Sequence, residues 1–183
     1  MKKILFILPI VALLAAGCNS SSQTNFSKLE EFKQSAPFPV LVPSYIPEAQ
    51  HYQVSIPTNR PKDYPAFILS SQDSSKTQIV IYQHLINRQF LIDHNDWDPA
   101  TGWPRSNGPK LGELPIQIGN NTGYLGASED IYLKFKQGDL IIEAHLTSSV
   151  LSGLYGKNNQ SSLESLALNS LVKDLVAIVG SMK

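Results

Sequence analysis

The sequence contains only one cysteine, Cys18, so no disulfide bond can form within the chain and the fold must rest on its hydrophobic core. Charged residues make up only 16% of the chain, and 15 basic side chains balance 15 acidic ones. No basic stripe with interleaved aromatic residues is present, which argues against nucleic acid as a partner. No long apolar run follows residue 16, so the sequence predicts no membrane-spanning helix beyond that point.

Sequence motifs for catalysis or metal binding are also missing. The chain has no Gly-x-Ser-x-Gly, His-Glu-x-x-His or Cys-x-x-Cys pattern. Its four histidines, His51, His84, His94 and His145, are scattered, and His84 and His145 lie at the ends of predicted strands, where we expect hydrogen-bonded side chains. We therefore expect a protein without enzymatic activity or a cofactor, although a Ser-His-Asp triad can assemble in space from distant residues.

The most informative feature that the sequence does have is its N-terminal segment. Two lysines follow Met1, residues 4–16 are apolar with one proline among them, and residues 14–18 read Leu-Ala-Ala-Gly-Cys. This layout is typical of a secretory signal peptide. The last five residues resemble the lipobox of bacterial lipoproteins, which implies cleavage before Cys18 and a diacylglyceryl group on its sulfur. An ordinary signal peptide, cut at the same place without lipidation, is the alternative.

The chain is thereby predicted to have three parts. Residues 1–17 are the signal peptide, residues 18–26 are the lipidated cysteine and a flexible tether, and residues 27–183 are a single α+β domain. The tether is predicted because residues 19–25 are small and polar and contain no apolar anchor. We expect the protein on the extracytoplasmic face of the cell membrane, held there by its lipid.

Strand patterns dominate the predicted domain. Runs of β-branched and aromatic residues separated by turn residues predict strands at 52–56, 66–71, 76–84, 89–92, 114–118, 122–126, 129–136 and 140–147. A short helix is predicted over 27–34 and an amphipathic helix from Asn169 to Met182; whether 162–168 belongs to the second is left open by the periodicity. The predicted fold class is α+β, a curved, mainly antiparallel sheet of about six to eight strands with a C-terminal amphipathic helix and a short N-terminal helix.

Two stretches of the domain resemble a known family. Residues 42–48 read Val-Pro-Ser-Tyr-Ile-Pro-Glu, and residues 116–125 and 171–182 carry the matching carboxyl-terminal pattern. The chain is similar in these places to the domain of unknown function 4367, found in lipoproteins of Gram-positive spore-formers and in the outer parts of anti-sigma factors. It departs from that family at 49–51 and by an extra loop at 97–110. The resemblance implies an extracytoplasmic β-rich domain without established enzymatic activity.

A short acidic stretch, residues 93–98, is the chain's candidate metal site. Asp93, Asp96 and Asp98 lie within six residues and could supply oxygen ligands to calcium. The EF-hand spacing fails, because Trp97 and Pro104 occupy the fifth and twelfth positions. The alternative is a solvated loop in which the carboxylates accept hydrogen bonds from nearby backbone groups.

The two tryptophans, Trp97 and Trp103, are the candidate ligand-binding residues. They lie in a long loop rich in proline and glycine between predicted strands, and loops of this length are often functional. Exposed indoles could stack on sugar rings or a peptide, or rest at a membrane interface. The alternative is that both fold back and cap an open end of the sheet.

Together these features predict a membrane-anchored, non-enzymatic binding or scaffolding module of the cell envelope. Besides the membrane, which it meets through Cys18, its candidate partners are an envelope protein, a peptidoglycan fragment or a lipid. A small envelope hydrolase and a solute- or metal-binding lipoprotein are the alternatives. A hydrolase requires a serine or carboxylate within hydrogen-bonding reach of a histidine in a pocket.

Overall fold

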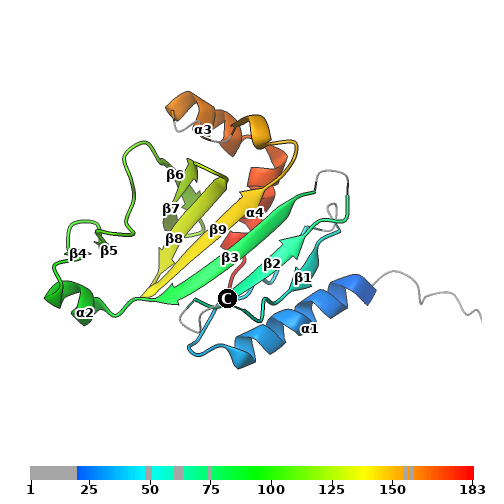
Figure 1. Ribbon diagram of the computed structural model, residues 1–183, viewed down its shortest axis with the longest axis horizontal. Helices are drawn as coiled ribbons and strands as arrows, with labels where there is room; N and C mark the ends of the chain where they lie inside the picture. Colours follow the sequence, from blue (N-terminus) through cyan, green and yellow to red (C-terminus); the bar gives the residue numbers. More distant parts are fainter. Residues whose placement is uncertain (1–19, 48–50, 60–63, 74–75, 155, 157–158) are drawn as a thin grey trace, which may run out of the picture.

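A computed structural model describes residues 20–47, 51–59, 64–73, 76–154, 156 and 159–183, and Cys18 lies outside them. Its main element is a seven-stranded antiparallel sheet with the strand order β1-β2-β3-β9-β8-β7-β6 (Figure 1). The strands are β1 Gln53–Ser55, β2 Ala66–Ser70, β3 Gln78–Leu85, β6 Leu114–Ile118, β7 Asn121–Ala127, β8 Ile131–Gln137 and β9 Leu140–Thr147. The predicted α+β fold is confirmed.

The strands are joined mainly by short turns, except at the centre of the sheet. The predicted hairpin of β8 and β9 is confirmed, and Gln137 pairs with Leu140 across a two-residue turn in which Gly138 has a φ of 61°. In contrast, β3 pairs with β9 although more than fifty residues separate them in sequence. The chain between β3 and β6 forms helix α2, Arg88–Asp93, and a small hairpin of β4, Trp97–Asp98, and β5, Trp103–Pro104.

One face of the sheet, the inner face, carries the hydrophobic core. Alternate residues of the central strands point into it, among them Ile79 and Ile81 of β3 and Ile142 of β9, all fully buried. Helices α1 (Ser20–Ser35), α3 (Gln160–Ala167) and α4 (Ser170–Gly180) supply the opposing apolar side chains. The helix predicted from Asn169 is confirmed as α4, whose first turn is capped by the Asn169 side chain.

The predicted flexible tether is wrong for residues 20–25, because α1 begins at Ser20. Asn25 is buried, and its amide donates to the carbonyl of Tyr52 at 2.6 Å and accepts from the amide of Val54 at 3.0 Å. Leu29 and Phe32 of the same helix are buried in the core. These contacts fix a segment whose polar composition indicates no packing partner.

Side-chain capping corrects one further prediction and decides one alternative that the periodicity left open. Residues 89–92, predicted as a strand, belong to α2, because Asn87 accepts a hydrogen bond from the amide of Phe90 and starts a helical turn. The region 162–168 belongs mostly to a separate helix, α3, which Asn159 caps in the same way. Within the described residues, no helix has the length and apolar character needed to cross a membrane.

Candidate functional site

The candidate site lies on the outer face of the sheet, the face that α4 does not cover. Residues of β3, β9 and β8 that alternate with the core positions point outward here, and cross-strand pairing sets His145 beside Tyr132 and Glu143 beside both Tyr82 and Lys134. Two parts of this face differ in how their polar groups are satisfied. We call them the pocket and the polar network.

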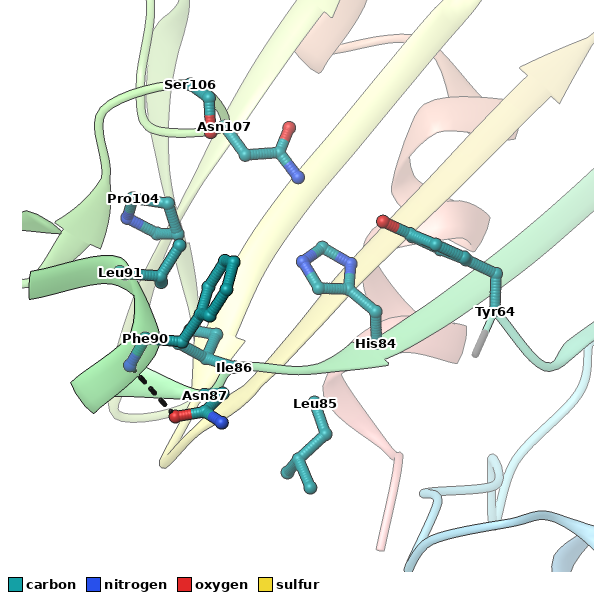
Figure 2. A pocket seen from close by; sticks show the side chains of 10 residues that line it. All are labelled: Tyr64, His84, Leu85, Ile86, Asn87, Phe90, Leu91, Pro104, Ser106 and Asn107. Atoms are coloured by element: carbon teal, nitrogen blue, oxygen red, sulfur yellow. Dashed lines mark hydrogen bonds between the residues drawn. The ribbon is translucent and has the colours of Figure 1, made fainter. Parts of the chain in front are cut away.

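The pocket has a volume of about 440 Å³ and opens where β3 ends and α2 begins (Figure 2). Its wall is built from β3, α2, the segment just before β2, the end of β5 and the segment after β5. The ten residues that line it are Tyr64, His84, Leu85, Ile86, Asn87, Phe90, Leu91, Pro104, Ser106 and Asn107. Tyr64, Leu85 and Phe90 are each about half exposed, so the rim presents large apolar surfaces to solvent.

His84 lies at the centre of the pocket. Its ring is 5.3 Å from that of Tyr64 and lies between Tyr64 and Phe90, below the amide of Asn107 (Figure 2). Burial lowers the pKa of His84 below its usual value, and the nearby Glu143 carboxylate only partly offsets this effect. The imidazole is therefore neutral at pH 7, with one ring nitrogen able to donate and the other able to accept a hydrogen bond. It makes no hydrogen bond with another described residue.

The hydrolase alternative requires a serine or carboxylate within hydrogen-bonding reach of a histidine, and Ser106 is the serine that lines this pocket. Its hydroxyl donates to Asp96 Oδ2 at 2.5 Å, and its backbone amide donates to Asp96 Oδ1 at 2.8 Å. The hydroxyl proton is thus held by a carboxylate rather than by the imidazole of His84. Among the described residues, no serine–histidine hydrogen bond forms in this pocket.

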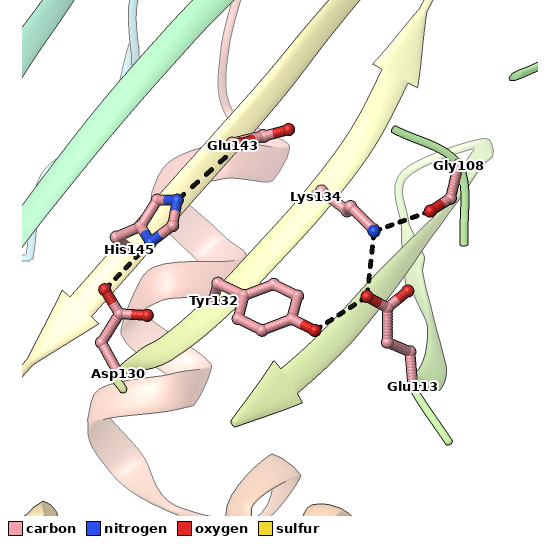
Figure 3. Close-up of polar contacts among 7 residues, drawn as sticks. All are labelled: Gly108, Glu113, Asp130, Tyr132, Lys134, Glu143 and His145. Atoms are coloured by element: carbon pink, nitrogen blue, oxygen red, sulfur yellow. Dashed lines mark hydrogen bonds and ion pairs between the residues drawn. The ribbon is translucent and has the colours of Figure 1, made fainter. Parts of the chain in front are cut away.

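The polar network occupies the part of the outer face over β8 and β9 (Figure 3). Lys134 pairs with Glu113 at 2.9 Å, with only 5% and 3% of the two side chains exposed, and also donates to the carbonyl of Gly108 at 2.8 Å. The hydroxyl of Tyr132 and the backbone amide of Lys110 donate to the two oxygens of the same carboxylate, each at 2.8 Å. The segment 108–113 is thereby tied onto the sheet through satisfied polar groups.

His145 forms the other half of the network. Its Nδ1 lies 2.9 Å from Asp130 Oδ2 and its Nε2 lies 3.8 Å from Glu143 Oε2. Burial by itself lowers the pKa of His145, but the two carboxylates outweigh it and raise the pKa to about 9. The contact with His145 in turn lowers the pKa of Glu143. His145 is therefore the predicted hydrogen-bonded sheet histidine, whereas His84 is not.

The structure places Trp97 and Trp103 behind the pocket rather than at its surface. They are 9% and 5% exposed and pack with Ile86 and Ile141, and with Leu91 at the edge of the cluster. Ile86 and Leu91 also line the pocket, so the indoles support its back wall. Both tryptophans therefore fold back against the sheet and are not exposed for stacking on a ligand.

The three candidate metal ligands do not converge. The carboxylate of Asp93 accepts from Gln89, that of Asp96 accepts from Ser106, and that of Asp98 accepts from the amide of Ala100 and the hydroxyl of Thr101, as in a local turn. The part of the chain that the structure describes contains no group of three or more histidine, cysteine or acidic residues that could hold a metal ion. The stretch is not one continuous loop, because Asp93 ends α2 and Asp98 belongs to β4.

Sequence reasoning missed the residues that form the pocket, above all Tyr64, Phe90 and Asn107. Tyr64 precedes β2 and Phe90 lies in the segment predicted as a strand, so neither stood out in the pattern. Phe90 reaches His84 from α2, which follows β3, whereas Tyr64 reaches it from the segment before β2, because β2 pairs with β3. The chain matches no protein-family model, no curated protein and no solved structure, so the resemblance to the domain of unknown function 4367 stays a prediction.

Proposed function

We propose that this chain is a membrane-anchored extracytoplasmic lipoprotein whose domain is a non-enzymatic binding module of the cell envelope, and that the pocket around His84 is its binding site. The observation that carries the proposal is the character of the pocket. The aromatic rings of Tyr64 and Phe90 are half exposed, and the side chains of His84 and Asn107 make no hydrogen bond with another described residue. A concave site with apolar surface and a few available polar groups is typical of a ligand-binding pocket.

The placement of α1 supports an anchored module with an accessible pocket. Only residue 19 separates Cys18 from the first residue of α1, and α1 is fixed to the domain through Asn25, Leu29 and Phe32. In Figure 1 the N-terminal end of α1 lies at the opposite end of the molecule from α2. An anchor that precedes α1 would therefore join the domain at the end remote from α2 and the pocket.

Photo-crosslinking in intact bacteria tests this function. Leu85 at the pocket rim and Leu168 between α3 and α4 are exposed leucines, at 53% and 72%, and each is replaced in turn by p-benzoylphenylalanine. We expect a covalent adduct from position 85 that disappears when Phe90→Ala is added, and none from position 168. In the same cells we expect Cys18 to incorporate labelled palmitate, with Cys18→Ala as the unlabelled control.

Two results would contradict the proposal. Equal adducts from both positions, or none from position 85, would show that the pocket has no partner of its own. A chain that takes up no palmitate and stays in the soluble fraction would remove the anchor.

A further inference from the structure

The lining of the pocket carries no formal charge at neutral pH. None of the ten described lining residues is Asp, Glu, Lys or Arg, and His84 is neutral because burial lowers its pKa. The guanidinium of Arg88 and the ammonium of Lys136 lie over the ring of Trp97, 4.9 and 6.0 Å from its centre. An anionic ligand would therefore lose its hydration without gaining a counter-charge from the lining.

The lining is also too polar for a purely apolar ligand. Tyr64, His84, Asn87, Ser106 and Asn107 make up half of it, and the side chains of His84 and Asn107 make no hydrogen bond with another described residue. Covering these two with an apolar group would cost on the order of 1–3 kcal/mol for each group left unsatisfied. A ligand that fits must both donate and accept hydrogen bonds, as imidazole, amide and hydroxyl groups do.

The lining also offers flat apolar surface. Tyr64 and Phe90 are 49% and 53% exposed, and their rings flank His84 from opposite sides (Figure 2). A sugar ring has the matching combination, since its carbon–hydrogen faces pack on aromatic rings while its hydroxyl groups donate and accept hydrogen bonds. The volume of about 440 Å³ lies within the range of ordinary small-ligand sites.

We propose, building on the function proposed above, that the ligand of this pocket is a neutral saccharide whose ring packs on Tyr64 and Phe90 and whose hydroxyl groups pair with His84 and Asn107. The site takes a sugar without carboxylate or phosphate groups. The tryptophans take part only as the wall behind it.

Intrinsic fluorescence tests this proposal on the full chain in phospholipid nanodiscs. Trp97 and Trp103 are the only tryptophans and pack against Ile86 and Leu91 of the pocket wall, so a ligand that enters should change their emission without a label. The probes are the neutral trimers of N-acetylglucosamine and of glucose, with the trimer of galacturonic acid as the charged comparison. Saturation-transfer NMR on the same samples gives a second readout.

We expect saturable binding of a neutral trimer in the millimolar range or tighter, and at least tenfold weaker binding of the galacturonic acid trimer. Tyr64→Ala and Phe90→Ala should each weaken binding about tenfold, the loss expected for one aromatic contact. The matched control is Tyr45→Ala, which removes a tyrosine that is 50% exposed and does not line the pocket, and it should bind as the wild type does.

Three outcomes would overturn the saccharide: no saturable signal with either neutral trimer, equal binding of the charged trimer, or equal losses in Tyr45→Ala and Tyr64→Ala. The in-cell crosslinking separates this failure from that of the proposed function. A protein adduct at position 85 without sugar binding would mean that the pocket binds a polypeptide, whereas neither adduct nor sugar binding would remove the binding module itself.

Discussion

The two parts of the outer face each contain a histidine and a tyrosine but differ in how their polar groups are used. In the polar network, Lys134, Glu113, Tyr132 and His145 each have a hydrogen-bond or ion-pair partner within the chain, at 2.8–2.9 Å. In the pocket, His84 and its aromatic neighbours face solvent, and the imidazole makes no hydrogen bond with another described residue. The paired groups of the network can therefore stabilise the fold, whereas the polar groups of the pocket remain available to a ligand.

The two histidines show the same difference in their protonation. His145 has carboxylates on both sides of its ring, which raise its pKa to about 9, whereas burial lowers the pKa of His84. They lie on adjacent strands and both interact with Glu143. A pattern of histidines in sequence thus does not separate a structural residue from a ligand-facing one, because the distinction depends on what the tertiary structure places beside each ring.

The largest effect is expected from breaking the network at its buried ion pair. Glu113→Gln keeps the shape of the side chain but leaves the ammonium of Lys134 buried without a counter-charge, and we expect it to lower the free energy of unfolding by about 3 kcal/mol. Asn107→Ala in the pocket should change it by less than about 0.5 kcal/mol, because that side chain makes no hydrogen bond with another described residue. Urea denaturation measures both; equal losses would mean that the two regions do not differ.

A smaller loss is expected when Tyr132 is displaced. The Tyr132 ring lies against Gly126 of β7 so closely that a Cβ there would overlap it, and Gly126→Ala must move the ring away from Glu113. We expect a loss of about 2 kcal/mol in urea denaturation. Gly153→Ala is the matched control, since a Cβ at position 153 meets nothing within 4 Å. Two alanine variants of equal stability would show that the Tyr132–Glu113 contact contributes nothing.

The smallest effect is the dependence of stability on pH. Because the folded pKa of His145 is raised, its contribution is complete below the unfolded pKa of about 6.5 and is lost as pH rises through about 9. The full shift corresponds to about 3 kcal/mol, and solvent screening of the side chain, which is 30% exposed, reduces the expected decrease to the order of 1 kcal/mol. His84 has the opposite sign: its folded pKa is lowered, so its contribution is present above about pH 6.5 and is lost as pH falls. Denaturation at several pH values measures both slopes.

Single variants show which histidine causes each pH dependence of the free energy of unfolding. His145→Gln should flatten the alkaline side and leave the acid side as it is, and His84→Gln should do the reverse. An alkaline slope that survives in His145→Gln would show that Asp130 and Glu143 do not hold the proton on this ring.

The strands were the most predictable part of this fold. Alternation of apolar and polar residues in 76–84 and 129–147 gave the correct faces and hairpin, because one face of the sheet is buried and register therefore shows in the pattern. One departure is informative: Lys134 occupies an outward position, as predicted, yet is buried, because the segment 108–113 lies over it. The alternation of apolar and polar residues in β8 does not show that another segment covers its outer face.

Local composition was least reliable where distant contacts decide the structure. Residues 20–25 have the composition of a tether, but Asn25 bonds to the backbone of Tyr52 and Val54, 27 and 29 residues away. The segment 89–92 has the residues of a strand, but the capping side chain of Asn87 starts a helix. In both cases a few hydrogen bonds outweigh the propensity of the segment.

The sequence alone determined the fold class, the faces of the main strands and the capped C-terminal helix, because each follows from the period of apolar residues along a short stretch. It also predicts an anchor at Cys18. Only the tertiary structure decided which polar groups are paired: the connection between β3 and β6 folds back over the sheet, buries Trp97 and Trp103 and ties Glu113 to Lys134. The same connection brings Asn107 to His84, and the pairing of β2 with β3 brings Tyr64 there, so the pocket forms from residues distant in sequence whose contacts no local pattern records.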